Sequence, residues 1–275
     1  MVTRMRRLAV AAIAAVIALG VGACRTVNGQ AAVPAPRVIA GVFGGMGPEA
    51  TANFYQLVVE LTPAGKDQEH VATLIYSFPQ VPDRTTAIRT GDPTIIPFLV
   101  EGVTRLEKAG ASFIAIPCNT AHYYFGAMQK AVTIPILNMI ELTAERVALD
   151  HPKAKKVGLL ATSGTIATGL YEKAFAARGI AVVTPDPAMQ EESVMGAVYA
   201  IKAGGDKREA EEKLFRAGKS VEAKGAEVVV LGCTEIPLAF NASRSGVPVV
   251  NATRVLAEAT IRTYQMLSLR GASDT

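Results

Sequence analysis

Short apolar runs recur along the chain, and most are bounded by glycine or proline. Four of them occupy residues 38–43, 113–116, 156–161 and 228–231, and most of these are rich in β-branched residues. Stretches with helical patterns separate these runs, and we expect helices over 121–131 and 166–178 among them. Such runs are typical of strands buried on both faces of a parallel sheet, with crossover helices between consecutive strands. The pattern therefore predicts an α/β fold.

Three features of the first half return in the same order in the second half. The first is a pair of glycines in a strand–turn–helix segment: Gly41 and Gly47 return 117 residues later as Gly158 and Gly164. The second is a cysteine at a strand end, where Cys118 returns 115 residues later as Cys233. The third is an apolar run that ends in asparagine, where Asn138 returns 113 residues later as Asn251. Three matches at nearly one offset indicate an internal duplication. We expect two similar, pseudo-symmetric α/β/α domains with parallel sheets, at 38–147 and 148–251. Ligands bind beyond the carboxyl ends of such strands.

The first 37 residues have a different character. Three arginines precede a run of sixteen small apolar residues, from Leu8 to Ala23, which is short for a membrane span of roughly 20 residues. Residues 21–24 resemble a bacterial lipobox, so we expect a signal peptide at 1–23 and lipidation of Cys24. Residues 24–37 then form a tether. This predicts an exported lipoprotein, in the periplasm or on the cell surface, held to the membrane only by its N-terminal lipid. An uncleaved anchor helix and an ordinary signal peptide are the alternatives.

Charge and composition exclude a nucleic-acid partner. The formal net charge is +4, but removing the three arginines of residues 1–23 from the 28 basic residues leaves 25 against 24 acidic ones. A nearly neutral chain lacks the basic surface that phosphate backbones require. Tryptophan is absent and aromatic residues make up 6%, which argues against stacking platforms for bases.

Candidate chemistry lies in the two repeated cysteines. Cys118 and Cys233 each end a predicted strand and are followed by capping residues, Asn119 and Thr120 in one case and Thr234 in the other. A helix N-terminus there would stabilise a thiolate. Two structural cysteines, a disulfide and a metal site are alternatives, and we expect no metal because the ligand pattern is incomplete. Inverting the α-carbon of a carbon acid needs a base on one face of that carbon and an acid on the opposite face. Two thiols about 7 Å apart could supply this pair.

Four motifs in order resemble the aspartate/glutamate racemase family: residues 44–51 (GGMGPEAT), 78–85 (FPQVPDRT), 117–122 (PCNTAH) and 231–237 (LGCTEIP). The resemblance covers about residues 38–266. It implies racemisation of an amino acid without a cofactor, with Cys118 and Cys233 as the acid and base, in a cleft between two domains. It also implies that a C-terminal helix, 252–268, returns to the first domain, and we expect a homodimer. Glu235 stands where cell-wall glutamate racemases usually have histidine, so the chain is similar to the aspartate branch.

The family also implies substrate contacts. Asn119, Thr120 and Thr234 offer donors for the α-carboxylate. Arg84, in a loop with several prolines, matches an arginine that contacts a side-chain carboxylate, and Lys202 matches a substrate-contacting lysine. Met46, in the first glycine loop, is expected in the cleft floor.

We therefore expect aspartate, ahead of glutamate, as the substrate. Asp83 would oppose this preference if its carboxylate paired with Arg84. The alternatives are an exported solute-binding lipoprotein, and a related carbanion enzyme such as a maleate isomerase or a hydantoin racemase.

Overall fold

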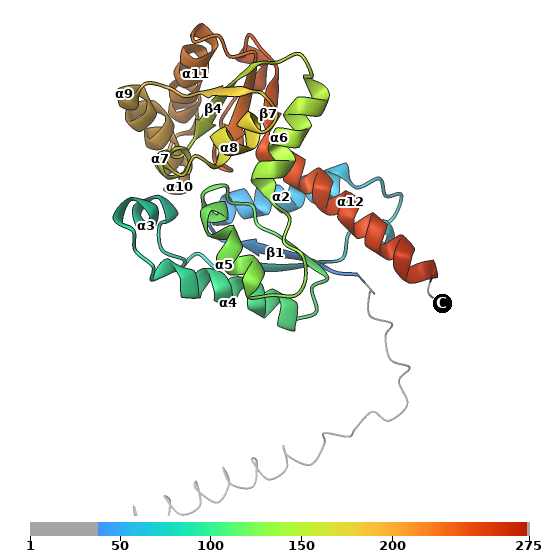
Figure 1. The fold of residues 1–275 in the computed structure, drawn as a ribbon. Coiled ribbons are helices and arrows are strands. Elements are labelled where there is room, and N and C mark those ends of the chain that lie inside the picture. The colour runs from blue at the N-terminus through green and yellow to red at the C-terminus, as the bar shows by residue number, and fades with distance from the viewer. Residues whose placement is uncertain (1–37, 274–275) are drawn as a thin grey trace, which may run out of the picture. The chain divides into compact units, whose positions relative to one another are not determined.

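The computed structural model describes residues 38–273 (Figure 1). The predicted signal peptide, Cys24 and the tether lie outside the described residues. None of the helices within the described range is long and apolar enough to cross a bilayer.

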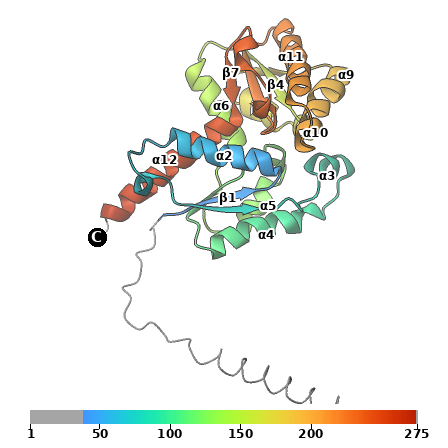
Figure 2. The same ribbon diagram turned by 180° about the vertical axis from the view of Figure 1, so that it is seen from behind.

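Two parallel sheets organise the described chain, as the apolar runs predict (Figures 1 and 2). The first sheet has the order β2-β1-β3, and the second has the order β5-β4-β6-β7. The strands of the first sheet are β1 (Ala40–Gly44), β2 (Thr73–Ser77) and β3 (Phe113–Ala115). Those of the second are β4 (Lys156–Ala161), β5 (Ala181–Val183), β6 (Val228–Gly232) and β7 (Val249–Asn251). Every pairing between them is parallel.

Helices connect the strands and cover the sheets. In the first half they are α2 (Pro48–Leu61), α3 (Arg84–Thr90), α4 (Ile95–Lys108), α5 (Phe125–Lys130) and α6 (Met139–Asp150), with 3₁₀ turns at Asp67–Glu69 and Thr120–Tyr124. In the second half they are α7 (Ser163–Ala167), α8 (Leu170–Ala176), α9 (Pro187–Met189), a π-helix (Gln190–Met195), α10 (Gly196–Lys202) and α11 (Lys207–Ala223), with 3₁₀ turns at Ile236–Leu238 and Ala242–Arg244.

Both faces of the central strand β1 are buried, which explains why this strand is apolar without interruption. Successive strand side chains point to opposite faces. Val42 accordingly packs in one core cluster with Phe54 of α2, whereas Phe43 packs in another with Leu99 of α4. The division into domains at residues 147 and 251 stays a prediction.

The C-terminal helix α12 (Ala252–Ser273) follows β7 but packs against α2 and α6. Leu256 and Ile261 of α12 share a core cluster with Val42 of β1. Both views show α12 running away from the second sheet and alongside α2 (Figures 1 and 2).

Three local expectations need correction. The run at 134–138 forms only an isolated bridge, between Ile114 and Ile136, whereas its counterpart forms β7. The helix expected over 166–178 is divided by Gly169, whose φ of +65° is a left-handed conformation that glycine adopts without strain. The helix expected over 121–131 begins as a 3₁₀ turn and continues as α5.

Candidate active site

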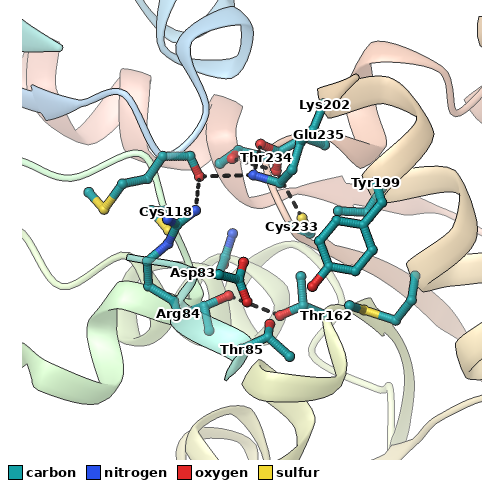
Figure 3. A pocket seen from close by; sticks show the side chains of 15 residues that line it. Asp83, Arg84, Thr85, Cys118, Thr162, Tyr199, Lys202, Cys233, Thr234 and Glu235 are labelled. Carbon is teal, nitrogen blue, oxygen red and sulfur yellow. Dashed lines mark hydrogen bonds and ion pairs between the residues drawn. The ribbon is translucent and has the colours of Figure 1, made fainter. Parts of the chain in front are cut away.

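A small cavity of about 340 Å³ lies where strands of both sheets end (Figure 3). All eight residues that the sequence assigned to catalysis or substrate contact line it: Met46, Arg84, Cys118, Asn119, Thr120, Lys202, Cys233 and Thr234. The other lining residues are Asp83, Thr85, Thr162, Met195, Val198, Tyr199 and Glu235. The fold thus brings the predicted residues together from segments almost 200 positions apart.

Cys118 lies just beyond β3 and is buried, as a free thiol. Its carbonyl oxygen accepts a hydrogen bond from Nδ1 of His122 at 2.8 Å, while Nε2 of the same ring accepts from the Met139 amide at 3.1 Å. Burial lowers the pKa of His122, so the ring is neutral. His122 therefore holds the backbone of the Cys118 loop and is not directed at a substrate.

The capping role expected for Asn119 and Thr120 is wrong. Neither side chain caps the 3₁₀ turn that follows. Asn119 accepts a hydrogen bond at Oδ1 from the Tyr171 hydroxyl at 2.7 Å, and its buried Nδ2 has no partner. Thr120 joins a triangle of hydroxyls with Thr162 and Thr165, at 2.9 Å from each. Both residues therefore connect the Cys118 loop to the second half of the chain.

Cys233 lies just beyond β6 and is also a buried, free thiol. Its Sγ donates to Oε2 of Glu235 at 3.1 Å. Burial raises the pKa of the Cys233 thiol well above its ordinary value, and the Glu235 carboxylate adds to this, although Lys202 opposes it. The expectation of a stabilised thiolate is therefore wrong for Cys233, because only a short 3₁₀ turn follows it and a carboxylate lies beside it.

Glu235 connects the two halves of the chain. It is 3% exposed, and its Oε1 accepts from Lys202 Nζ at 2.7 Å and from the Gly47 amide at 3.1 Å. Lys202 also donates to the Met46 carbonyl at 3.2 Å. Burial alone would lower the pKa of Lys202. The attraction of Glu235 and Cys233 outweighs this effect and raises the pKa of Lys202, so the ammonium group stays charged.

Arg84 is the first residue of α3 and not part of a loop as expected. Its guanidinium donates to the carbonyls of Val81, Pro82 and Met46, at 3.2, 3.1 and 2.9 Å, and its Nε is buried without a partner. Asp83 accepts from the Thr86 amide at 2.8 Å and so caps α3. Within residues 38–273 no carboxylate forms an ion pair with Arg84, so its charge is free to meet an anion.

Sequence reasoning missed several lining residues. Glu235 was noted only as a difference from histidine, although it is two positions after Cys233. Met195, Val198, Tyr199 and Lys202 have the i, i+3, i+4, i+7 spacing of one helix face, a signal that was present in the sequence. Thr162 follows β4 at the turn that the duplication pairs with the first glycine loop.

Comparisons with known proteins give one consistent result. A family model described as Asp/Glu/Hydantoin racemase matches residues 43–260. The chain is 30% identical over 230 residues to a broad specificity amino-acid racemase, RacX, of Bacillus subtilis, which covers 82% of this chain and 97% of that protein.

Solved structures agree with this match. The aspartate racemase of Picrophilus torridus is 31% identical, with a TM-score of 0.74, over 83% of this chain and 94% of that one. An aspartate racemase homologue from Pyrococcus horikoshii is 27% identical, with a TM-score of 0.66, over 84% of this chain and 100% of that one. A glutamate racemase of Bacillus anthracis, at 20% identity and a TM-score of 0.61, shares the fold.

Proposed function

Because the chain belongs to the Asp/Glu/hydantoin racemase family and is an isomerase, we propose that it inverts the α-carbon of acidic amino acids, aspartate ahead of glutamate. The observation that carries this proposal is the pair of buried thiols, Cys118 and Cys233, which line one cavity together with Arg84, an arginine that forms no ion pair with a carboxylate of residues 38–273. The family match sets aside the alternative of a solute-binding lipoprotein. A homodimer stays a prediction.

The proposed reaction moves one proton off the α-carbon and another one on. For one enantiomer, the Cys118 thiolate takes the α-proton, and the Cys233 thiol delivers its own proton to the opposite face. The cysteines exchange roles for the other enantiomer. The raised pKa of Cys233 supports its role as the proton donor in the first of these directions, because it keeps the Cys233 thiol protonated in the resting enzyme. The bond broken and the bond formed are both C–H bonds, so no redox change occurs and no cofactor is proposed.

The cavity offers a partner for each charged group of aspartate. The Nδ2 of Asn119, which has no partner among the described residues, suits the α-carboxylate, and Thr234 lines the same cavity. Asp83 uses only Oδ1 to cap α3, which leaves Oδ2 for the α-ammonium group. Arg84 suits the side-chain carboxylate.

A chiral assay tests the proposal. Purified protein should interconvert L- and D-aspartate, glutamate more slowly and alanine least, when each enantiomer of a panel of amino acids is followed by chiral chromatography. Maleate and a 5-substituted hydantoin belong in the same panel, because they are the substrates of the two alternative activities, maleate isomerisation and hydantoin racemisation. Turnover of these alone, or of nothing, would contradict an amino-acid substrate.

Arg84→Met should change substrate preference. A charge-assisted hydrogen bond is worth about 1.5–3 kcal/mol, so we expect kcat/KM for aspartate to fall by roughly 10- to 100-fold. Turnover of alanine should change little, since alanine leaves the guanidinium unpaired in any case. Arg89→Met, which removes an exposed arginine from the same helix, is the matched control. An unchanged ratio of aspartate to alanine efficiency would mean that Arg84 does not read the side chain.

We also propose export and lipidation, on the sequence of residues 1–24. Cys24→Ala should abolish labelling of the full-length protein with palmitate and move it from the membrane fraction to the soluble fraction. Racemisation by the purified protein should be unaffected, because all the residues that line the cavity lie between Met46 and Glu235. Cys118→Ala is the control that should keep the label. A Cys24→Ala protein that still sediments with membranes would point to an uncleaved anchor helix.

A further inference from the structure

Tyr171 is a buried tyrosine on α8 that does not line the cavity. It is fully buried, and its ring stacks on Phe175 with centroids 6.0 Å apart. A Cβ built on Gly232 would lie 3.1 Å from Cε2 of Tyr171. The ring therefore packs against the backbone of the residue directly before Cys233.

The hydroxyl of the same residue reaches the other cysteine loop. It donates to Oδ1 of Asn119, directly after Cys118, at 2.7 Å, and Thr143 of α6 lies beside it. Because Oδ1 is the acceptor, the amide can only be oriented with Nδ2 turned away from Tyr171. That Nδ2 is buried, has no hydrogen-bond partner among the described residues and belongs to a side chain that lines the cavity.

Packing alone does not require this hydroxyl, since phenylalanine would fill the same space. A buried hydroxyl costs free energy unless it is hydrogen-bonded, so its value here lies in the bond to Asn119. Removal of an α-proton shifts negative charge onto the α-carboxylate. A donor already aimed at that carboxylate stabilises the transition state without having to reorient.

We propose that Tyr171 is a positioning residue of the racemase: its hydroxyl fixes the Asn119 amide so that Nδ2 faces the α-carboxylate of the substrate. This inference rests on the proposed function. Tyr171 acts from the second half of the chain on a side chain of the first half, and its ring is held by the strand end that carries Cys233.

The test is a double-mutant cycle between Tyr171→Phe and Asn119→Ala, with aspartate as the substrate. Tyr171→Phe alone should lower kcat/KM about tenfold, since one oriented hydrogen bond is lost. In the Asn119→Ala background the same change should lower kcat/KM less than about twofold, because the group through which Tyr171 acts is gone. Thr260→Val, which removes a buried hydroxyl of α12 that does not line the cavity, should lower the melting temperature and leave kcat/KM unchanged.

Other outcomes would overturn the inference. An equal loss in both backgrounds would mean that Tyr171 supports the fold and does not act through Asn119. Wild-type kcat/KM in Tyr171→Phe would mean that the hydroxyl is not used. A wild-type enzyme that racemises no amino acid would instead remove the proposed function, and this inference with it.

Discussion

Replacing either Cys118 or Cys233 by alanine is expected to lower racemisation by about 10²- to 10⁴-fold, the range that one acid or base group contributes. Each thiol is buried in the same cavity, and neither is in a disulfide, so both are available for proton transfer. No other described group is placed to replace Cys118, because the nearby His122 holds its backbone and is neutral. Racemisation of both enantiomers of aspartate is the measurement.

Proton exchange in D₂O separates the two faces of the substrate. A variant with one thiol can remove an α-proton and return a deuteron to the same face, without inversion. Cys118→Ala and Cys233→Ala should therefore each exchange one enantiomer, and opposite ones. Cys24→Ala, the third cysteine of the chain, is the control that should racemise normally. Exchange of the same enantiomer by both variants would be incompatible with two thiols on opposite faces.

Glu235→Gln should lower kcat/KM near neutral pH by about 100-fold and shift its pH profile. Racemisation needs one thiol and one thiolate, so activity is lost at high pH when the second thiol loses its proton. The Glu235 carboxylate adds to the burial that raises the pKa of Cys233. Without its charge, the pKa of Cys233 falls, and Lys202, no longer paired, lowers it further. The alkaline limb of the profile should therefore move to lower pH.

The control is Glu191→Gln, which alters a carboxylate bonded to Ser163 and outside the cavity. It should keep the wild-type profile. An alkaline limb that stays in place, or moves upward, in Glu235→Gln would show that this carboxylate does not govern the protonation of Cys233. Circular dichroism of both variants separates this result from a loss of folding.

The fold was largely predictable because burial on both faces leaves a local signature. The run at 156–161 coincides with β4, and the cysteines lie just beyond β3 and β6, at the strand ends that the duplication indicates. Duplication also placed the two thiols at matching positions. Local patterns were less informative where a break depends on one residue, as at Gly169, because helical periodicity continues across it.

The contacts within the site were harder to predict, because they join distant segments. Glu235 bonds the amide of Gly47, 188 positions away, and no local pattern reports that distance. The same holds for Asn119, whose residue type suits a cap but whose side chain is taken by Tyr171. The pKa of Cys233 depends on burial and on Glu235, which only the tertiary structure combines.

The return of α12 to the first sheet affects how the protein is made. Strand β1 is synthesised long before α12, so α2 covers the apolar face that carries Val42 only in part until Leu256 and Ile261 have been synthesised. Domains usually fold as units during synthesis, N-terminal ones first. Here the core beneath this face of the first sheet is completed only after α12 has been synthesised, so the first sheet is stabilised late. Such a delay suits a polypeptide that crosses a membrane before folding, as the export proposed for this protein requires.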